Sequence, residues 1–437
     1  MALHHVIIGS GIAGLSAAET LRQRDPQASI TMISEEAHDF YSRPGLAYLL
    51  RGDIPEKQLY VRTRDDLAAL NIRRIAARAQ KVNCDRQELA LPDGQPVRYD
   101  RLLLAMGATA VPPPFPGGEL AGVVKLDSLD DARHILKHAG RGKTAVVVGG
   151  GITALELVEG LLARRMPVHY LMRSARYWSD VLDDTESRII LDRLRHEGVI
   201  IHTNTQVQQA AGTRGKLTGV VTQAGETIPC QMLAVAIGVR PRAELARAAG
   251  LNVDRGVVVN AFLETSRPGV FAAGDVAQVF DAVSGCATMD VLWSTALAQG
   301  RVAGANMAGA SLAYVKGIPF NVTQLAGLKV TIVGAVGRGK DTDLVSIARG
   351  DSEAWRLLPM TAVISEGDGV DRIRLLLGER RIVGALVMGN QTWSRPLQRL
   401  VTRQADITPI RPALLRDPAT ALAHLQQFCE QWERRGS

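Results

Sequence analysis

Two short glycine-rich segments carry the residue types and the spacing that bind phosphate groups. One reads Gly9-Ser10-Gly11-Ile12-Ala13-Gly14 and the other reads Gly149-Gly150-Gly151-Ile152-Thr153-Ala154, so both follow the pattern G-x-G-x-x-G/A. The first glycine of this pattern makes a tight turn, the second lets the backbone approach a pyrophosphate, and the third small residue lets a helix pack on a strand. Two such segments in one chain predict two dinucleotide-binding sites.

Each segment lies between residues that predict a strand before it and a helix after it. Residues 5–8 and 144–148 are mostly apolar runs typical of buried strands, and residues 15–21 and 155–158 predict the helices. A helix that begins at such a turn presents its unpaired N–H groups and the positive end of its dipole to a phosphate. Because this unit occurs twice, we expect an α/β fold with two Rossmann-like domains.

The first unit carries acidic residues after its second predicted strand. The strand at residues 29–33 is followed by Glu35 and Glu36. Glu35 lies about twenty residues after the third glycine, where a carboxylate accepts a hydrogen bond from a ribose 2′-hydroxyl. This acid strengthens the interpretation of the first segment as a dinucleotide site.

The second unit has arginines in the corresponding place. The strand at residues 168–171 is followed by Met172 and Arg173, and Arg176 comes shortly after. A missing acid with nearby arginines suits a ribose 2′-phosphate, and one arginine–phosphate contact contributes about 1.5–3 kcal/mol. We therefore expect NADPH, with NADH as the second choice. Solvated surface arginines are the alternative interpretation of Arg173 and Arg176.

The composition limits the class of protein. The chain has 437 residues, of which 46% are hydrophobic and 22% are charged, as in a globular protein of roughly two or three domains. No uninterrupted apolar run reaches about 18 residues and no leader precedes the first strand, so we expect no membrane span and a cytoplasmic location. The net charge of +7 favours an acidic partner, and we expect no nucleic-acid partner.

The cysteine and histidine residues show no convincing metal-binding pattern. The four cysteines are far apart in the sequence and no C-x-x-C occurs, so we expect neither a zinc nor an iron–sulfur site. His134 and His138 are one helical turn apart, and we interpret them as part of a solvated helix face.

Three further motifs resemble those of a known superfamily. Residues 99–107 read as a strand that ends in Ala105-Met106-Gly107, residues 234–241 contain a G-x-R-P sequence that begins at Gly238, and residues 269–275 read Gly-Val-Phe-Ala-Ala-Gly-Asp. In this order, together with the glycine-rich segments, they resemble the two-dinucleotide-binding-domain flavoproteins, the FAD-dependent pyridine nucleotide oxidoreductases. The resemblance covers nearly the whole chain. It implies that FAD is the resident cofactor and that NAD(P)H is the electron donor.

The same resemblance implies which residues contact the cofactors. Gly274 would allow the backbone to approach FAD closely, and Asp275 would bind the ribityl chain of FAD. The complete set of predicted cofactor-binding residues is Gly9, Ser10, Gly11, Ala13, Gly14, Glu35, Glu36, Arg43, Ala105, Met106, Gly107, Gly149, Gly151, Ile152, Ala154, Arg173, Arg176, Gly238, Gly274 and Asp275.

The resemblance also implies a division of the chain in which one dinucleotide-binding domain is inserted in the other. The proline-rich residues 112–116 mark the first crossing. We expect the FAD-binding domain at residues 1–112 and 243–314, the NAD(P)-binding domain at residues 113–242, and a C-terminal α+β domain at residues 315–437. That last domain would cover the flavin or form a dimer or partner interface, so we consider a homodimer.

Residues 39–50 indicate the subfamily. Disulfide reductases of the superfamily carry two cysteines in this region and the peroxidases carry one, whereas this chain carries none. A redox-active disulfide is excluded there because the reactive group is a thiolate. The sequence Tyr41-Ser42-Arg43-Pro44 instead resembles rubredoxin reductases and the flavin modules of nitrite reductases, which pass electrons singly to a protein partner.

Three residues are predicted to act beside the flavin. Ferredoxin reductases pair a glutamate of the second glycine-rich helix with a lysine near the flavin; Glu156 matches the glutamate, and Tyr48 lies near the place of the lysine. Trp293 resembles a tryptophan between the flavin and the partner, with a core aromatic at a helix start as the alternative. Glu156, Tyr48 and Trp293 are the predicted catalytic residues.

These motifs together predict an FAD-dependent NAD(P)H oxidoreductase. We expect it to pass electrons from NAD(P)H to a small acidic redox protein of the rubredoxin or ferredoxin kind. Two alternatives stay open. One is the reduction of a diffusible acceptor such as a quinone, dioxygen or a partner in the nitrite pathway, and the other is a role as the flavoprotein subunit of a larger complex.

Overall fold

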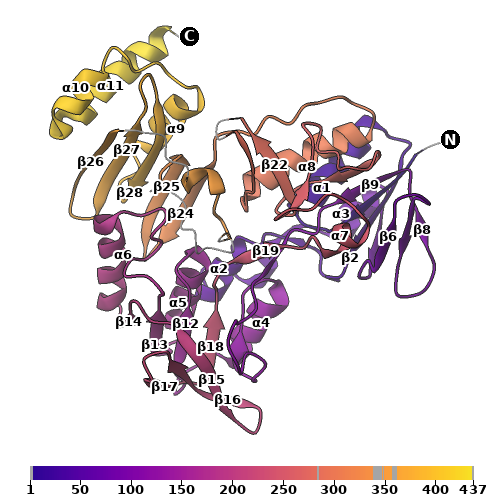
Figure 1. The fold of residues 1–437 in the computed structure, drawn as a ribbon, viewed down its shortest axis with the longest axis horizontal. Coiled ribbons are helices and arrows are strands. Elements are labelled where there is room, and N and C mark those ends of the chain that lie inside the picture. The colour runs from indigo at the N-terminus through magenta and orange to yellow at the C-terminus, as the bar shows by residue number, and fades with distance from the viewer. Residues whose placement is uncertain (1–2, 283–284, 338–346, 348, 357–361, 436–437) are drawn as a thin grey trace.

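The chain folds into three lobes, which Figure 1 shows around a central junction. One lobe contains the first glycine-rich segment, a second contains the other glycine-rich segment, and the third contains the C-terminus. The computed structural model describes residues 3–282, 285–337, 347, 349–356 and 362–435.

The first lobe is built on a parallel sheet in the order β21-β9-β1-β2-β5. Parallel neighbours require crossover connections, and α1 (Ile12–Arg24) forms part of the one between β1 and β2. Helix α8 (Trp293–Met307) packs closely on α1 through Gly300 and Gly304, where an added Cβ would lie 2.2 and 2.5 Å from carbonyl oxygens of α1. The strands are β1 (His4–Ile8), β2 (Ser29–Ser34), β5 (Ile72–Ala76), β9 (Arg101–Leu104) and β21 (Val270–Ala272).

The second lobe repeats this plan with a parallel sheet in the order β11-β18-β12-β13-β14. Its strands are β11 (Val123–Val124), β12 (Ala145–Val148), β13 (Val168–Leu171), β14 (Ile200–His202) and β18 (Met232–Val235). Its helices are α4 (Leu129–His138), α5 (Ile152–Ala163) and α6 (Asp184–His196). The two glycine-rich segments thus follow β1 and β12 and begin α1 and α5, which confirms the predicted α/β architecture.

Short elements join these two lobes. Strands β10 (Ala108–Ala110) and β19 (Val239–Pro241) pair antiparallel where the chain passes from one lobe to the other. Helix α2 (Gly45–Arg51) packs on α5, and the contact is close because a Cβ added to Gly160 would lie 2.8 Å from the Cβ of Leu50. This contact brings the side chains of α2 and α5 to the junction between the two parallel sheets.

The third lobe is an antiparallel sheet, in the order β24-β25-β28-β27-β26, that is covered by helices. Helix α11 packs against β26, and Leu397, Leu414 and Leu425 fill the core between helices and sheet. These elements confirm the predicted α+β domain. They are β24 (Phe320–Leu325), β25 (Leu328–Gly334), β26 (Ala362–Asp368), β27 (Asp371–Leu377), β28 (Ile382–Met388), α9 (Ser394–Thr402), α10 (Arg411–Arg416) and α11 (Pro418–Arg435).

Buried ion pairs attach the third lobe to the second. Arg374 of β27 donates to Glu186 of α6 over 3.0 Å, and both side chains are almost completely buried. Nearby, Arg372 lies 3.3 Å from Asp183. Because one-sided loss of a buried ion pair is costly, these contacts hold the C-terminal sheet against α6.

Smaller sheets and helices complete the lobes. They are β3 (Phe40–Tyr41), β4 (Tyr60–Arg62), β6 (Lys81–Asn83), β7 (Glu88–Ala90), β8 (Val97–Arg98), β15 (Val207–Thr213), β16 (Lys216–Thr222), β17 (Thr227–Pro229), β20 (Val257–Val258), β22 (Ala277–Asp281), β23 (Cys286–Thr288), α3 (Arg64–Ala69), α7 (Glu244–Ala248) and two 3₁₀ turns at Glu56–Leu59 and Glu353–Arg356.

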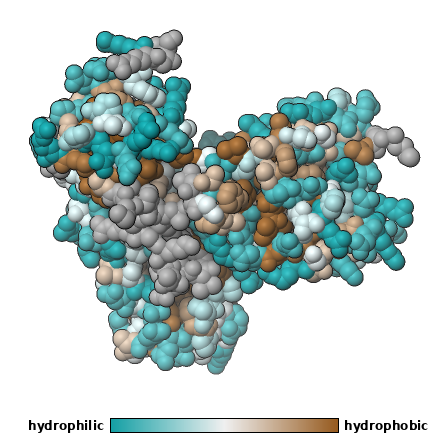
Figure 2. All heavy atoms as spheres, turned by 45° about the horizontal axis from the view of Figure 1, so that its top comes forward, coloured by the Kyte–Doolittle hydropathy of each residue, from teal (hydrophilic) through white to brown (hydrophobic). Residues whose placement is uncertain are grey.

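The surface in Figure 2 is mostly hydrophilic, with hydrophobic residues gathered in separate patches. Among the described residues, no helix has both the length and the apolar character that a membrane crossing requires.

Candidate functional site

Three loops meet at the carboxyl ends of the strands of the first sheet. Gly9 follows β1, residues 105–107 follow β9, and Gly274 and Asp275 follow β21. In open parallel sheets, ligands bind outside the carboxyl ends of the strands. The sequence motifs predicted for FAD are therefore brought together at the edge where a ligand is expected.

The first glycine-rich segment leaves a space for a phosphate group. Gly9 has a φ of +112°, and a Cβ added there would lie 2.1 Å from the carbonyl oxygen of Ala105. A Cβ on Gly14 would lie 2.0 Å from the carbonyl oxygen of Gly9, whereas a Cβ on Gly11 would meet no protein atom within 4 Å. Gly9 and Gly14 are thus required by packing. Gly11 instead faces open space, as the backbone approach to a pyrophosphate requires.

The helices that begin at the two glycine-rich segments have free N-termini. Helices α1 and α5 begin after Gly11 and Gly151, with no side-chain cap and no acidic residue in the first turn. Helices α3, α4 and α6, in contrast, all have complete capping boxes. The unpaired N–H groups of α1 and α5 are therefore available to anions, and these helix dipoles favour bound phosphate.

The second segment has the same backbone geometry as the first. Gly149 has a φ of +147°, and a Cβ there would lie 2.1 Å from the carbonyl oxygen of Ala236 at the end of β18. A narrow crevice beside it is lined by Gly151, Thr153 and Gly238, together with Arg349 of the third lobe. This crevice continues from the N-terminus of α5, where a nicotinamide dinucleotide would place its pyrophosphate.

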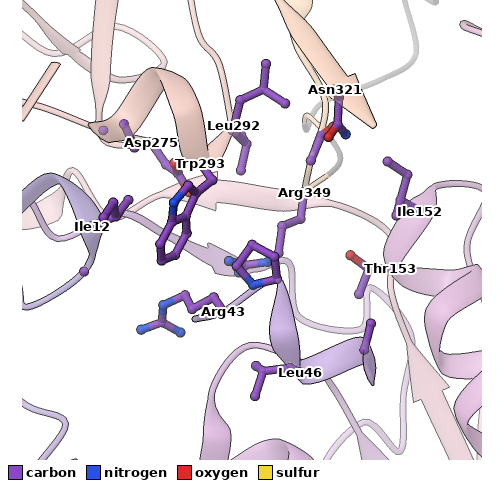
Figure 3. A pocket seen from close by; sticks show the side chains of 18 of the residues that line it. Ile12, Arg43, Leu46, Ile152, Thr153, Asp275, Leu292, Trp293, Asn321 and Arg349 are labelled. Atoms are coloured by element: carbon purple, nitrogen blue, oxygen red, sulfur yellow. The ribbon is translucent and has the colours of Figure 1, made fainter. Parts of the chain in front are cut away.

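One pocket connects the two dinucleotide sites, and Figure 3 shows side chains from all three lobes around it. Trp293 and Arg43 lie on the side of the first lobe, Ile152 and Thr153 on the side of α5, and Arg349 extends between them. The predicted residues that line this pocket are Gly11, Ala13, Arg43, Tyr48, Ala105, Gly107, Ile152, Glu156, Gly274, Asp275 and Trp293.

The other predicted residues lie outside that pocket. Gly151 and Gly238 line the crevice beside α5. Gly9, Ser10, Gly14, Glu35, Glu36 and Met106 belong to the first lobe, and Gly149, Ala154, Arg173 and Arg176 belong to the second.

The two acidic residues after β2 have different partners. Glu36 forms an ion pair with Arg43 and accepts a hydrogen bond from the hydroxyl of Tyr41 over 2.7 Å. Glu35 pairs with Arg242 and lies 3.8 Å from Arg78. Glu36 therefore orients Arg43 at the pocket wall, while Glu35 stays half-exposed at the end of β2, where the ribose acid of the fold is expected.

The arginines after β13 lie in the loop that follows this strand. One nitrogen of the Arg176 guanidinium, Nη1, donates a hydrogen bond to the carboxylate of Asp184 over 2.7 Å. The backbone of the loop is held by a hydrogen bond from the hydroxyl of Ser174 to the carbonyl oxygen of Arg176 over 2.7 Å. Arg176 is thus oriented by a surface carboxylate at the edge of the predicted nucleotide site.

Sequence reasoning missed the charged group at the centre of the junction. The buried carboxylate of Asp127 binds Arg349, accepts a hydrogen bond from Thr109 over 2.8 Å, and lies 3.5 Å from Arg242 and from Lys125. Burial opposes the ionisation of Asp127, but Arg349 and the other partners hold the pKa of this carboxyl below its usual range. Only the third lobe supplies Arg349, so no local sequence signal indicates this cluster.

Two carboxyl groups in the pocket wall have raised pKa values. Burial, assisted by the nearby charge of Glu159, raises the pKa of Glu156 to about 7. Burial also raises the pKa of Asp275, although Arg349 and Arg43 oppose that shift. Carboxyl groups with shifted pKa values in a pocket are candidates for functional roles, and the pKa of Glu156 lies close to neutral pH.

The two predicted aromatic residues lie at the border of the pocket. Tyr48 is 42% exposed, and the guanidinium of Arg51 lies 4.8 Å from the centre of its ring. Trp293 is the first residue of α8, and its ring packs 5.9 Å from that of Phe40. Trp293 therefore contacts both the pocket and the core, so both interpretations of this residue are compatible with its position.

None of the four cysteines lines the pocket. The described residues also contain no group of three or more His, Cys, Asp or Glu side chains arranged to hold a metal ion. The Nδ1–H of His138 donates a hydrogen bond to the carbonyl oxygen of His134 over 2.8 Å on an exposed helix face.

The residues present fit FAD in the first lobe and a nicotinamide dinucleotide in the second. The space beside Gly11 and the free N-terminus of α1 suit the pyrophosphate of FAD, and Asp275 lies where the sheet opens into the pocket. The free N-terminus of α5 suits the second pyrophosphate. Both sites lead into the same pocket, as electron exchange between two dinucleotides requires.

Comparisons with known proteins agree with this geometry. The NADH oxidase of Methanocaldococcus jannaschii is 28% identical over 402 residues, covering 88% of this chain and 87% of that protein. The ferredoxin–NAD(+) reductase component of the biphenyl dioxygenase system of Paraburkholderia xenovorans is 30% identical over 389 residues, covering 87% and 93%. A chain in the crystal structure of the covalent putidaredoxin reductase–putidaredoxin complex matches with a TM-score of 0.86 and 26% identity, covering 98% of this chain and 100% of its own.

A family model adds the last comparison. The model described as pyridine nucleotide-disulphide oxidoreductase matches residues 3–300, which include both glycine-rich segments and Asp275. The chain therefore belongs to the pyridine nucleotide-disulphide oxidoreductase family.

Proposed function

We propose that this FAD-dependent NAD(P)H oxidoreductase passes electrons to a small redox protein of the ferredoxin or rubredoxin kind. The observation that carries the proposal is the single pocket where the two dinucleotide sites meet, which contains no cysteine. Without a thiol in the pocket, the electrons cannot pass through a redox-active disulfide there. The similarity to a ferredoxin–NAD(+) reductase component and to a putidaredoxin reductase complex supports a protein acceptor.

The residues of the chain would act mainly by orientation. The N-termini of α1 and α5 would hold the two pyrophosphates, and Arg43 and Asp275 would fix the first dinucleotide at the pocket. Bound FAD supplies the chemistry that links two-electron donors to one-electron acceptors. Thr153 and Ile152 would orient the nicotinamide, since they line the pocket from the start of α5.

Tyr48 and Trp293 would form the border between the flavin and the acceptor. The exposure of Tyr48 means that an acceptor can contact this residue directly. The net charge of +7 would attract an acidic carrier, and such attraction accelerates association at low ionic strength. We therefore propose an acidic carrier that docks at the mouth of the pocket.

Two finer proposals follow the sequence predictions. We propose NADPH as the preferred donor, because Arg173 and Arg176 follow β13 where an acid would otherwise bind the ribose. We also propose the division into residues 1–112 and 243–314, 113–242, and 315–437, because β10 and β19 pair close to two of these boundaries.

The acceptor is tested by steady-state assays with a fixed donor and a choice of acceptors. We expect acidic ferredoxins or rubredoxins to be reduced faster than dioxygen or a quinone, with a rate that falls about tenfold or more as salt screens the charges. The similarity to an NADH oxidase favours dioxygen as the second candidate. Rapid hydrogen peroxide or water formation, with no salt-dependent reduction of any carrier protein, would favour that candidate and contradict the proposal.

A further inference from the structure

The carboxyl group of Glu156 lies in the wall of the pocket without a fixed partner. It projects from the second turn of α5 and lines the same space as Thr153, Asp275 and Trp293. Within the part of the chain that the structure describes, no hydrogen bond or ion pair involves its oxygens. An unpaired acid in a concave site shared with a cofactor is a candidate for proton exchange with that site.

The cations around Glu156 are engaged by other carboxylates. Arg51 of α2 donates to Glu159 over 2.9 Å and to Asp53 over 2.8 Å, and its guanidinium lies over the ring of Tyr48. Arg349 is held by Asp127. The charged and titratable groups around Glu156 are Glu159 on the same helix, Arg51 on α2, Arg349 from the third lobe and Tyr177 from the loop after β13. The other titratable groups that line the same pocket are Tyr41, Arg43, Tyr48, Asp127 and Asp275.

This arrangement makes the charge of Glu156 responsive to the charge of the pocket. Glu159 is one turn further along α5 and stays close to Glu156, so it adds negative charge beside it. Burial of the carboxylate is the larger effect, and together with the charge of Glu159 it raises the pKa of Glu156 to about 7. An additional negative charge in the pocket would then raise the proton affinity of this carboxylate further.

We propose that Glu156 takes up one proton from water when electrons enter the pocket and releases it when they leave. The inference rests on the proposed function. A hydride from NAD(P)H brings two electrons and one proton, which makes the pocket one unit more negative, and a proton on an Oε atom of Glu156 restores the charge. When two electrons depart, the proton of the hydride and the proton on Glu156 both return to water. Two protons thus accompany two electrons.

The test measures the midpoint potential of bound FAD against pH in mildly alkaline solution, above the pKa of about 7 at which Glu156 ionises before reduction. Dithionite and mediators replace NAD(P)H. We expect two protons per two electrons in the unmodified protein and one in Glu156→Gln. Thr153→Val is the matched control, because it changes a polar atom of the same pocket wall without removing a titratable group, and it should retain two. A proton count that is the same in Glu156→Gln and in the unmodified protein would overturn the inference.

A second readout can overturn the inference in the unmodified protein alone. The infrared difference spectrum between reduced and oxidised protein should contain the carbonyl stretch of a newly protonated carboxyl group, and this band should be missing in Glu156→Gln. Its absence from the unmodified protein would overturn the inference. Because dithionite supplies the electrons, failure of NAD(P)H to reduce the protein would contradict the proposed function and leave this result standing.

Discussion

Gly14 and Gly11 of the first glycine-rich segment have different roles, one in packing and one in cofactor binding. Two substitutions distinguish these roles. A Cβ on Gly14 would collide with the carbonyl oxygen of Gly9, so Gly14→Ala should lower the free energy of unfolding by about 1–3 kcal/mol or more. A Cβ on Gly11 would meet no protein atom within 4 Å, so Gly11→Ala should leave the apoprotein about as stable as before. The same substitution should weaken FAD binding by about tenfold or more, because the methyl group would occupy the space needed by the pyrophosphate.

Denaturant unfolding of the apoproteins and FAD titration together check this pair. Equal loss of stability in both variants would mean that Gly11 is needed for packing and not for a ligand. Unchanged FAD affinity in Gly11→Ala would mean that FAD does not bind against this loop.

A second residue-scale prediction concerns acid stability. His5 is fully buried in β1, both of its ring nitrogens lack a partner among the described residues, and burial lowers its pKa to about 4. The unfolded chain binds a proton at this ring near pH 6.5, so the stabilisation is complete above that pH and is lost as the pH falls toward 4. The loss amounts to about 3 kcal/mol. In His5→Leu the denaturation midpoint should fall less steeply over this window, and an unchanged slope would rule out His5 as the cause.

At the scale of elements, the attachment of β27 to α6 offers a direct test. Arg374→Met should cost about 3–5 kcal/mol, because it leaves the buried carboxylate of Glu186 without its partner. Adding Glu186→Gln should recover the part of that loss that comes from the unpaired charge, whereas the hydrogen bonds from Arg374 to the carbonyl oxygens of Val336 and Val181 stay lost. Glutamine has no charge, and its side-chain oxygen can still accept the capping hydrogen bond that Glu186 receives from the backbone of Asp183 over 2.9 Å. Thermal unfolding of the single and double variants measures this coupling; simple addition of the two losses would contradict it.

The elements also show how far the sequence could predict the structure. The strand, turn and helix units around Gly9 and Gly149 follow from local rules, since turn glycines and buried runs are short-range signals. The resemblance added the loop after β21 that contains Gly274 and Asp275. The contact of Arg51 with Glu159 could not be predicted, because it depends on how closely α2 packs on α5 around Gly160.

Long-range contacts explain what was missed at the centre of the site. Asp127 and Arg349 are 222 positions apart in the sequence, and they meet only because the third lobe reaches the junction of the other two. No sequence periodicity or motif predicts this contact between Asp127 and Arg349. The sequence indicated that Tyr48 lies near the place expected for a lysine, but it did not indicate that Glu159 binds the nearby Arg51.

At the scale of the whole molecule, three lobes meet at one pocket, and each lobe supplies a different part of the pocket wall. The first lobe supplies the space beside Gly11 and the loop of Asp275, the second supplies the free N-terminus of α5, and the third supplies Arg349. Because the third lobe is attached to α6, movement of the second lobe relative to the first would also move Arg349. The pocket is therefore a joint property of all three lobes.

Electron exchange between the two dinucleotide sites in this pocket is tested most directly by an anaerobic titration with NADPH and, separately, with NADH. Loss of the visible flavin absorbance at one equivalent of donor is the predicted result, with tighter binding of NADPH than of NADH. In Arg173→Ala/Arg176→Ala this preference should disappear while the loss of absorbance with NADH persists. Retention of the full absorbance with both donors, in a protein that contains bound FAD, would contradict electron exchange between the two sites.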